Sequence, residues 1–294
     1  MSSAAFVTDY AAACAKIEAD QAAQVATPGF NPALHSLLLT HGAKTRRAVL
    51  WFHGYTSAPP QFRRLAELCY ARGDNVCVPC VPHHGFKDRQ SPELSRVNGR
   101  ELVQFINETV DRMHGLGEEV VVGGLSMGGA MASWVAQFRA DVAQAVIVSP
   151  FLGAYTIPTR WTFAAAKAVR LLPDQRDWWD PERKADCLGP DYGYVKRSTH
   201  SIGEIFRLGE QVFAAARRRP PAVQRVWMVV NDNDRSVNNE MIQRLVNDWR
   251  ARGAQHIETY HFPADLGLPH DCISVEAPNN QPELVYAELL RMLN

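Results

Sequence analysis

Short apolar runs alternate with longer amphipathic segments along most of the chain. Ala48 to Phe52 (AVLWF) is a continuous apolar run that stops at His53-Gly54, as expected for a strand buried on both faces. Further strand-like runs lie at 75–81, 120–122, 142–148, 225–230 and 257–262, and helical patterns lie at 60–71, 98–114, after residue 126 and at 283–293. This alternation predicts an α/β fold with a mainly parallel central sheet flanked by helices.

The stretch 151–221 breaks the alternation. It shows no clear strand pattern, is rich in aromatic residues and is punctuated by prolines. We predict a helical cap (lid) inserted over the carboxyl ends of the strands, while 31–150 and 222–294 form the core. Ordinary helices packed on the sheet edge are the alternative. Residues 1–30 are expected to form an N-terminal helical extension whose packing partner the sequence does not show.

Composition narrows the class of protein. The 294 residues are 46% apolar, and 31 basic residues balance 31 acidic ones, which disfavours a nucleic-acid partner. No uninterrupted apolar stretch reaches the length of about 18 residues that a membrane span needs, so stable membrane insertion is not expected. The first residues do not read as a secretory signal, and six scattered cysteines favour reduced thiols and a cytoplasmic location. The sequence does not indicate an oligomeric state.

One apolar run ends in a glycine-rich turn. Residues 120–122 lead into Gly123-Gly124-Leu125-Ser126-Met127-Gly128-Gly129, and an alanine-rich helical pattern follows. A serine between glycines at a strand-to-helix turn is the G-x-S-x-G nucleophile elbow. Its neighbours must be small, because a Cβ there would collide with the strand or the helix. A structural glycine turn that happens to hold a serine is the alternative.

A serine hydroxyl needs a histidine to take its proton and a carboxylate to orient that histidine. Asp232 and Asp234 follow the run at 225–230, and His270 follows the last run. Each group would lie at the carboxyl end of a strand, where catalytic groups collect in open α/β sheets. We favour His270, and His256 and His261, within or beside the last strand, compete with it. Whichever of the two carboxylates does not orient the histidine would cap a turn.

These landmarks resemble the α/β-hydrolase fold family, particularly its bacterial carboxylesterases and monoacylglycerol-lipase-like serine hydrolases. From about residue 35 onward, the matching motifs follow in the family's order: His53-Gly54-Tyr55, His84-Gly85, Gly124-Leu125-Ser126-Met127-Gly128-Gly129, Asp234-Arg235-Ser236-Val237 and His270. His83 departs from the pattern, since family members usually carry glycine there, and this puts the local backbone shape in question.

The resemblance implies a role for each matching residue. Ser126 would be the nucleophile, His270 the general base, and Asp234 the group that orients the imidazole and stabilises its cation. The backbone N–H groups of Tyr55 and Met127 would form the oxyanion hole. No metal or organic cofactor is implied.

The expected reaction is hydrolysis of a small-molecule carboxylic ester through an acyl-serine intermediate. The aromatic insertion favours short- to medium-chain acyl or aryl esters, with monoacylglycerols among the candidates. Trp178, Trp179 and Tyr155 are candidate substrate-binding residues, although the tryptophans could equally anchor the insertion. Thioesterases, amidases or peptidases, carbon–carbon hydrolases and acyltransferases use the same machinery. A non-catalytic ligand-binding protein with this fold is the alternative of another class.

Cys77-Val78-Pro79-Cys80 matches C-x-x-C and has His83 and His84 nearby. Residues three apart on a strand face opposite ways, so this spacing disfavours a zinc site. Buried thiols are the expectation.

Overall fold

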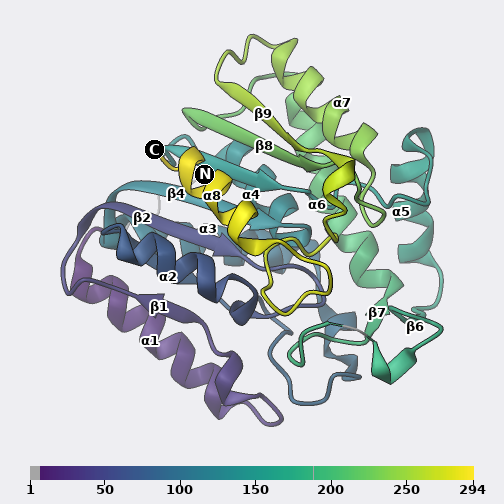
Figure 1. Ribbon diagram of the computed structural model, residues 1–294, viewed down its shortest axis with the longest axis horizontal. Coiled ribbons are helices and arrows are strands. Elements are labelled where there is room, and N and C mark those ends of the chain that lie inside the picture. The colour runs from purple at the N-terminus through teal and green to yellow at the C-terminus, as the bar shows by residue number, and fades with distance from the viewer. Residues whose placement is uncertain (1–6, 188) are drawn as a thin grey trace.

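The computed structural model describes residues 7–187 and 189–294. Its main sheet has the strand order β1-β3-β2-β4-β5-β8-β9, and only the β1–β3 pair is antiparallel. This confirms the predicted α/β fold with a mainly parallel sheet (Figure 1). The strand bounds are β1 Leu37–Leu39, β2 Thr45–Phe52, β3 Asn75–Val78, β4 Gly117–Leu125, β5 Gln144–Val148, β8 Arg225–Asn231 and β9 Ile257–Phe262.

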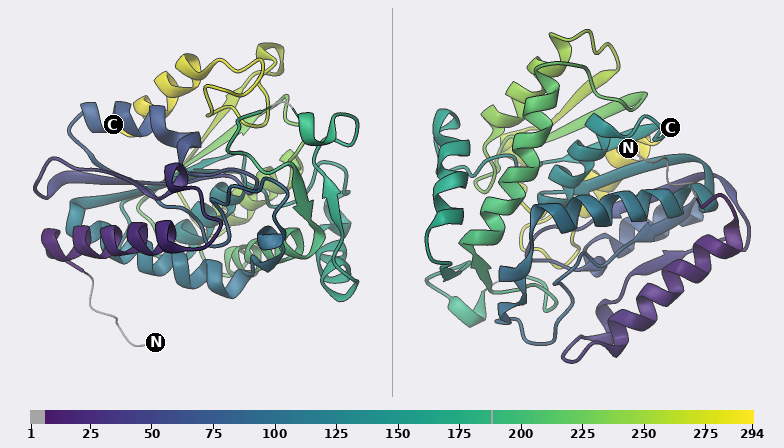
Figure 2. Two further views of the ribbon diagram at one scale, coloured as in Figure 1. Left: turned by 90° about the horizontal axis from the view of Figure 1, so that it is seen from below. Right: turned by 180° about the vertical axis from the view of Figure 1, so that it is seen from behind.

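Helices cover both faces of this sheet, which explains why its strands are apolar without alternation. Figure 2 (left) shows α2 and α8 on one side and α1 and α3 on the other. Val49 and Trp51 of β2 belong to the first of these layers, whereas Leu50 and Phe52 belong to the second. The helix bounds are α1 Tyr10–Ala26, α2 Arg63–Ala71, α3 Gly99–Leu116, α4 Met127–Phe138, α5 Thr162–Leu171, α6 Thr199–Ala216, α7 Asn239–Arg250 and α8 Pro282–Met292.

The N-terminal extension packs against α3. Ala13 and Ile17 of α1 are buried in the same hydrophobic cluster as Met113 of α3. A Cβ at Gly115 of α3 would lie only 2.5 Å from the Ala13 Cβ, so glycine at that position permits the close approach of the two helices. Residues 1–6 of the predicted extension lie outside the described residues.

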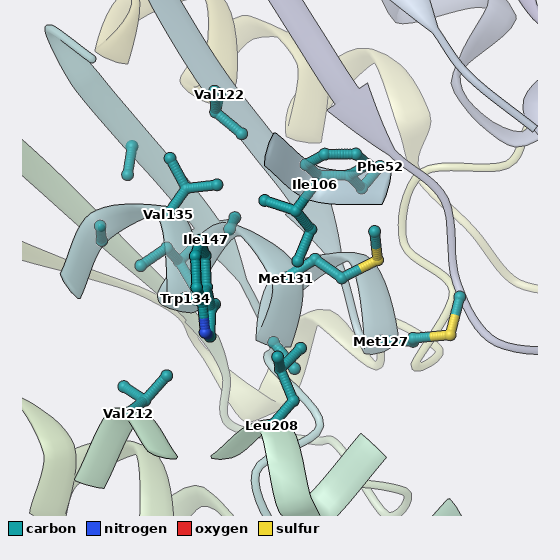
Figure 3. Close-up of a cluster of buried hydrophobic side chains, with 14 of the residues drawn as sticks. Phe52, Ile106, Val122, Met127, Met131, Trp134, Val135, Ile147, Leu208 and Val212 are labelled. Carbon is teal, nitrogen blue, oxygen red and sulfur yellow. The ribbon is translucent and has the colours of Figure 1, made fainter. Parts of the chain in front are cut away.

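The segment 151–221 differs in part from the sequence expectation. It contains α5 and α6, but also two short antiparallel strands, β6 (Arg176–Trp178) and β7 (Lys196–Ser198). Within the described part of this segment, α6 packs against the main core and the β6–β7 pair does not. Leu208 and Val212 of α6 lie in the main core near Met131 and Trp134 of α4 (Figure 3). The β6–β7 pair instead lies beyond the end of the central sheet (Figure 1).

Two hydrogen bonds tie β7 and the residues just before it to the loop that follows β2. The Tyr194 N–H donates to the Thr56 carbonyl over 2.8 Å, and the Ser198 N–H donates to the Tyr55 hydroxyl over 3.0 Å. Because β2 is parallel to its neighbours, this loop lies at the carboxyl ends of the parallel strands. Among the helices within 7–187 and 189–294, none combines the length and apolar character required to cross a membrane.

Candidate active site

Ser126 occupies a sharp turn between β4 and α4. Its backbone has φ 61° and ψ −115°, a conformation that L-residues adopt rarely and at a cost. The surrounding chain holds this conformation. The Ser126 N–H donates to the Val148 carbonyl over 3.1 Å, and its own carbonyl accepts from the Ala130 and Phe151 N–H groups, both at 2.9 Å. The hydroxyl-bearing side chain is thereby fixed at the carboxyl end of the sheet.

The flanking glycines are required by close backbone packing. A Cβ at Gly128 would lie 2.0 Å from the Phe52 carbonyl oxygen, and a Cβ at Gly124 would lie 2.5 Å from the Gly128 carbonyl carbon. Both contacts are to main-chain atoms that cannot rotate away. This geometry agrees with the steric reason for small residues on both sides of Ser126.

Asp234 and His270 meet at the ends of β8 and β9. The imidazole Nδ1 lies 2.6 Å from Asp234 Oδ2, and Asp234 Oδ1 accepts from the Ser236 and Val237 N–H groups at 2.8 and 3.2 Å. The carboxylate is fully buried, whereas the His270 side chain is 18% exposed. A buried, oriented carboxylate beside a partly exposed imidazole is the arrangement that prepares a histidine to accept a proton.

The two groups shift each other's pKa. Burial alone would raise the pKa of Asp234, but the adjacent imidazole and three hydrogen bonds lower it below its usual value. Burial alone would lower the pKa of His270, but the Asp234 carboxylate raises it above its usual value. Each partner therefore favours the charged form of the other.

Asp232, the competing carboxylate, lies in a different environment. It accepts from Nδ1 of His261 over 2.9 Å, and both side chains are more than 40% exposed. The structure thus pairs each acidic residue of the loop with its own histidine. Of the two histidines, His270 lines the same cavities as Ser126, and His261 lines neither.

Two asparagines that sequence analysis did not single out hold the histidine loop in place. The Asn231 side-chain amide donates to the Leu268 and Pro269 carbonyls at 3.1 and 3.0 Å, and Asn233 donates to the same Leu268 carbonyl over 3.0 Å. Asn231 is buried. The run Asn231-Asp232-Asn233-Asp234 could have indicated these asparagines in the sequence, because amide and carboxylate side chains readily form hydrogen bonds with the backbone of a loop.

The loop after β2 is braced by two buried histidines. His84 Nε2 donates to the Tyr55 carbonyl over 2.5 Å, while His53 Nε2 accepts from the Val81 N–H over 3.1 Å. Burial, and secondarily the neighbouring imidazole of His84, lowers the pKa of His53 to about 3, and burial lowers the pKa of His84 to about 4. Both rings are therefore neutral near pH 7 and serve as hydrogen-bonding braces.

Two backbone N–H groups near Ser126 remain available. The Gly54 N–H donates to Gln61 Oε1 over 2.7 Å, but the Tyr55 N–H has no acceptor among the described residues. Met127 is the first residue of α4, and the first N–H groups of a helix have no acceptor within it.

Ser126 and His270 line two cavities that share several residues. One cavity has a volume of about 260 Å³ and is bordered by Tyr192 and Tyr194. The other has a volume of about 400 Å³ and is bordered by Phe151 and Phe206, among others.

Among the described residues, the Ser126 hydroxyl makes no hydrogen bond to the His270 imidazole. Catalytic hydrogen bonds are often long in unliganded enzymes.

Two of the three predicted substrate-binding residues line the cavities beside Ser126, and the third does not. Trp179 lines both cavities and Tyr155 lines the larger one, but Trp178 lines neither. Trp178 instead has the Lys196 ammonium 4.4 Å above its ring. Neighbouring residues of an extended chain point to opposite faces, so only one of two adjacent tryptophans can face the serine.

Comparison with known proteins identifies the family. Residues 37–285 match the model of the alpha/beta hydrolase family. The chain belongs to this family. The thermostable monoacylglycerol lipase of Bacillus sp. strain H-257 is 27% identical over 225 residues, which cover 73% of this chain and 84% of that relative.

Solved structures agree on the fold. A structure of the metagenome-derived lipolytic enzymes LipS and LipT gives a TM-score of 0.68 at 20% identity and covers 90% of this chain and 98% of its own. The monoacylglycerol lipase of Paleococcus ferrophilus gives 0.65 at 20% identity, with coverages of 88% and 98%. At these identities the structures support the α/β-hydrolase fold.

This α/β hydrolase keeps a glycine-like backbone at His83, where the sequence raised doubt about the local shape. His83 has φ 68°, in the left-handed region that glycine adopts most readily. Its imidazole Nε2 lies 2.8 Å from Glu101 and its Nδ1 lies 3.5 Å from Glu93. The turn is therefore retained with a side chain that two carboxylates hold.

The C-x-x-C pair of this α/β hydrolase is buried. Cys77 belongs to β3, and burial raises the pKa of its thiol to about 12. Burial also raises the pKa of Cys80. Within 7–187 and 189–294, no three histidine, cysteine or acidic side chains are grouped as a metal site would require.

Proposed function

We propose that this α/β hydrolase cleaves carboxylic esters through an acyl-serine intermediate on Ser126. The observation that carries the proposal is the 2.6 Å contact of the buried Asp234 carboxylate with His270, whose imidazole shares two cavities with the strained serine. The Bacillus relative, a monoacylglycerol lipase, supports ester hydrolysis as the reaction type.

In the proposed mechanism, His270 Nε2 takes the proton of the Ser126 hydroxyl, because Nδ1 is engaged by Asp234. The serine oxygen attacks the ester carbonyl, and the Tyr55 and Met127 N–H groups stabilise the resulting oxyanion. The imidazolium then protonates the departing alcohol. A water molecule, deprotonated by the same imidazole, attacks the acyl-serine and releases the acid with the free enzyme.

The proposed substrates are short- to medium-chain acyl or aryl esters, including monoacylglycerols. Aromatic side chains border both cavities, and volumes of about 260 and 400 Å³ suit small ligands. We further propose that the part of 151–221 that carries β6 and β7 acts as the cap over this site. Cys14, Cys69, Cys77, Cys80 and Cys272 are free thiols, which favours a reducing, cytoplasmic location.

Labelling with a fluorophosphonate tests the nucleophile before any substrate is known. We expect a mass increase on the peptide that carries Ser126, and no increase in Ser126→Ala or His270→Ala. Turnover of p-nitrophenyl esters should exceed that of acyl-CoA and aminoacyl amides. Ligand binding without labelling or turnover would instead support a non-catalytic receptor, and preferred turnover of acyl-CoA would support a thioesterase.

A further inference from the structure

The larger cavity beside Ser126 contains two guanidinium groups that the proposed mechanism does not use. Arg197 comes from β7 and Arg235 directly follows Asp234, so the two side chains reach the cavity from different parts of the fold. Both line the same space as Ser126 and His270. Arg197 is half-buried and Arg235 is exposed, so both guanidinium groups are accessible to a ligand that enters the cavity.

Each guanidinium lies over an aromatic ring. The Arg197 guanidinium is 5.6 Å from the centre of the Trp179 ring, and that of Arg235 is 5.2 Å from the centre of the Tyr155 ring. Arg235 also donates a hydrogen bond to the Tyr155 hydroxyl. Stacking on a ring restricts the side chain while most of its N–H donors remain free at the edge of the group.

Neither arginine forms an ion pair within the part of the chain that the structure describes. No carboxylate oxygen of residues 7–187 and 189–294 lies within 4.0 Å of either guanidinium. Asp177 is the one carboxylate among the described residues that line this cavity. It lies opposite Arg197 in the backbone register of β6 and β7, but the two side chains form no salt bridge. The cavity therefore has two positive charges and one negative charge before His270 is counted.

We propose that Arg197 and Arg235 bind an oxyanion group of the substrate, a carboxylate or a phosphate, at a distance from the bond that is cleaved. The planar donor fork of arginine matches the paired oxygens of such groups. This α/β hydrolase therefore prefers esters that carry a negative charge over neutral esters of the same size. The inference rests on the proposed function, because it takes Ser126 as the point of attack.

Two matched substrate pairs test this preference. The first pair is p-nitrophenyl valerate and mono-p-nitrophenyl glutarate, which place a methyl or a carboxylate at the end of similar acyl chains. The second pair is monobutyrylglycerol and monobutyrylglycerol phosphate, which differ on the alcohol side. We expect a higher kcat/KM for the anionic member of at least one pair, and the pair that shows it identifies the group as carboxylate or phosphate. The advantage should shrink as ionic strength rises, because salt screens partly exposed charges.

Charge variants assign the preference to these residues. Arg197→Gln and Arg235→Gln should each lower the anionic-to-neutral ratio of kcat/KM about tenfold, the typical effect of losing one charge-assisted hydrogen bond. Asp177→Asn should raise that ratio by about twofold to threefold, because it removes the opposing charge. Arg160→Gln is the matched control, since this arginine also stacks on an aromatic ring, Trp161 at 5.9 Å, but does not line the cavity. It should leave the ratio unchanged.

The proposal is overturned if wild-type enzyme prefers the neutral member of both pairs. It is also overturned if the anionic preference survives in both arginine variants. Failure of the proposed function looks different, because no ester would then be hydrolysed and the fluorophosphonate would not label Ser126. In that case, calorimetric binding of mono-p-nitrophenyl glutarate to Ser126→Ala, with and without Arg197→Gln, still decides whether the anion site exists.

Discussion

Replacing Ser126 with glycine should make the protein inactive and yet more stable than replacing it with alanine. Both substitutions remove the hydroxyl, which makes no hydrogen bond to His270 in the structure. They differ in the backbone, because Ser126→Ala keeps a Cβ at φ 61° and ψ −115°, whereas Ser126→Gly does not. Glycine adopts positive φ without steric cost. The comparison therefore isolates the strain stored at the turn.

The expected difference follows from two opposing contributions. A residue held in such a sparsely populated region costs about 1–3 kcal/mol, which the glycine variant recovers. Glycine also gives the unfolded chain more conformational freedom, which offsets about 0.5–1 kcal/mol of that gain. The free energy of unfolding should therefore be about 1 kcal/mol higher for Ser126→Gly than for Ser126→Ala. For a chain of this size that corresponds to a Tm about 2–4 °C higher.

Urea and thermal unfolding followed by circular dichroism measure this difference directly. Ser133 supplies the matched control, because it lies within α4, where glycine is less favourable than alanine by about 1 kcal/mol. Ser133→Gly should accordingly be less stable than Ser133→Ala, the opposite order to that at Ser126. Equal stabilities at Ser126, or a more stable alanine variant, would refute the idea that the elbow stores strain.

Three further changes test the surroundings of the serine. Asp234→Asn should reduce kcat by several orders of magnitude and move the acidic limb of the pH–rate profile to lower pH, because neutral His270 is required and Asp234 is what raises its pKa. An unmoved limb would contradict this. Gly128→Ala should lower the unfolding free energy measured by urea titration by about 3 kcal/mol, the upper end of the usual cost of overpacking, because its Cβ would meet the Phe52 carbonyl at 2.0 Å. Tyr55→Phe should lower kcat more than it raises KM in steady-state assays, because the phenol fixes the loop that presents the Tyr55 N–H; an effect on KM alone would count against that role.

Much of the fold could be predicted because both faces of the sheet are covered. Val49 and Trp51 contact one helical layer and Leu50 and Phe52 the other, so β2 reads as an unbroken apolar run. The elbow could be predicted for a steric reason, since no residue larger than glycine fits at 128. In both cases a local sequence pattern reflects packing on every side.

The short strands of the structure were not predictable in the same way. Strands β6 and β7 are three residues each, with the sequences RDW and KRS, and neither has enough apolar residues to show alternation. Contacts with distant loops, such as that of Tyr194 with Thr56, hold the pair in place. The three-residue strand β1 pairs antiparallel at the sheet edge and is equally short for a periodic signal.

The pairing of acidic and histidine residues also depends on tertiary structure. Asp232 and Asp234 are two residues apart, and each contacts a histidine. The family resemblance favours Asp234, but the local sequence does not show which histidine each carboxylate contacts. The choice is made by the loop that carries His270, which Asn231 and Asn233 bond through its carbonyls. Asp234 is buried in contact with this loop, whereas Asp232 is exposed.

The two adjacent tryptophans offer a final test, because the sequence alone left open whether they line the acyl pocket or anchor the insertion. Trp179 lines the cavities with Ser126, whereas Trp178 stacks with Lys196 on the other face of the strand pair. Trp179→Ala should therefore lower the ratio of kcat/KM for p-nitrophenyl octanoate to that for the acetate about tenfold, equivalent to lost contact with two methylenes at about 0.8 kcal/mol each. Trp178→Ala should leave that ratio unchanged and lower only the stability. Equal effects of the two substitutions on the chain-length ratio would show that strand alternation does not decide which ring meets the acyl chain.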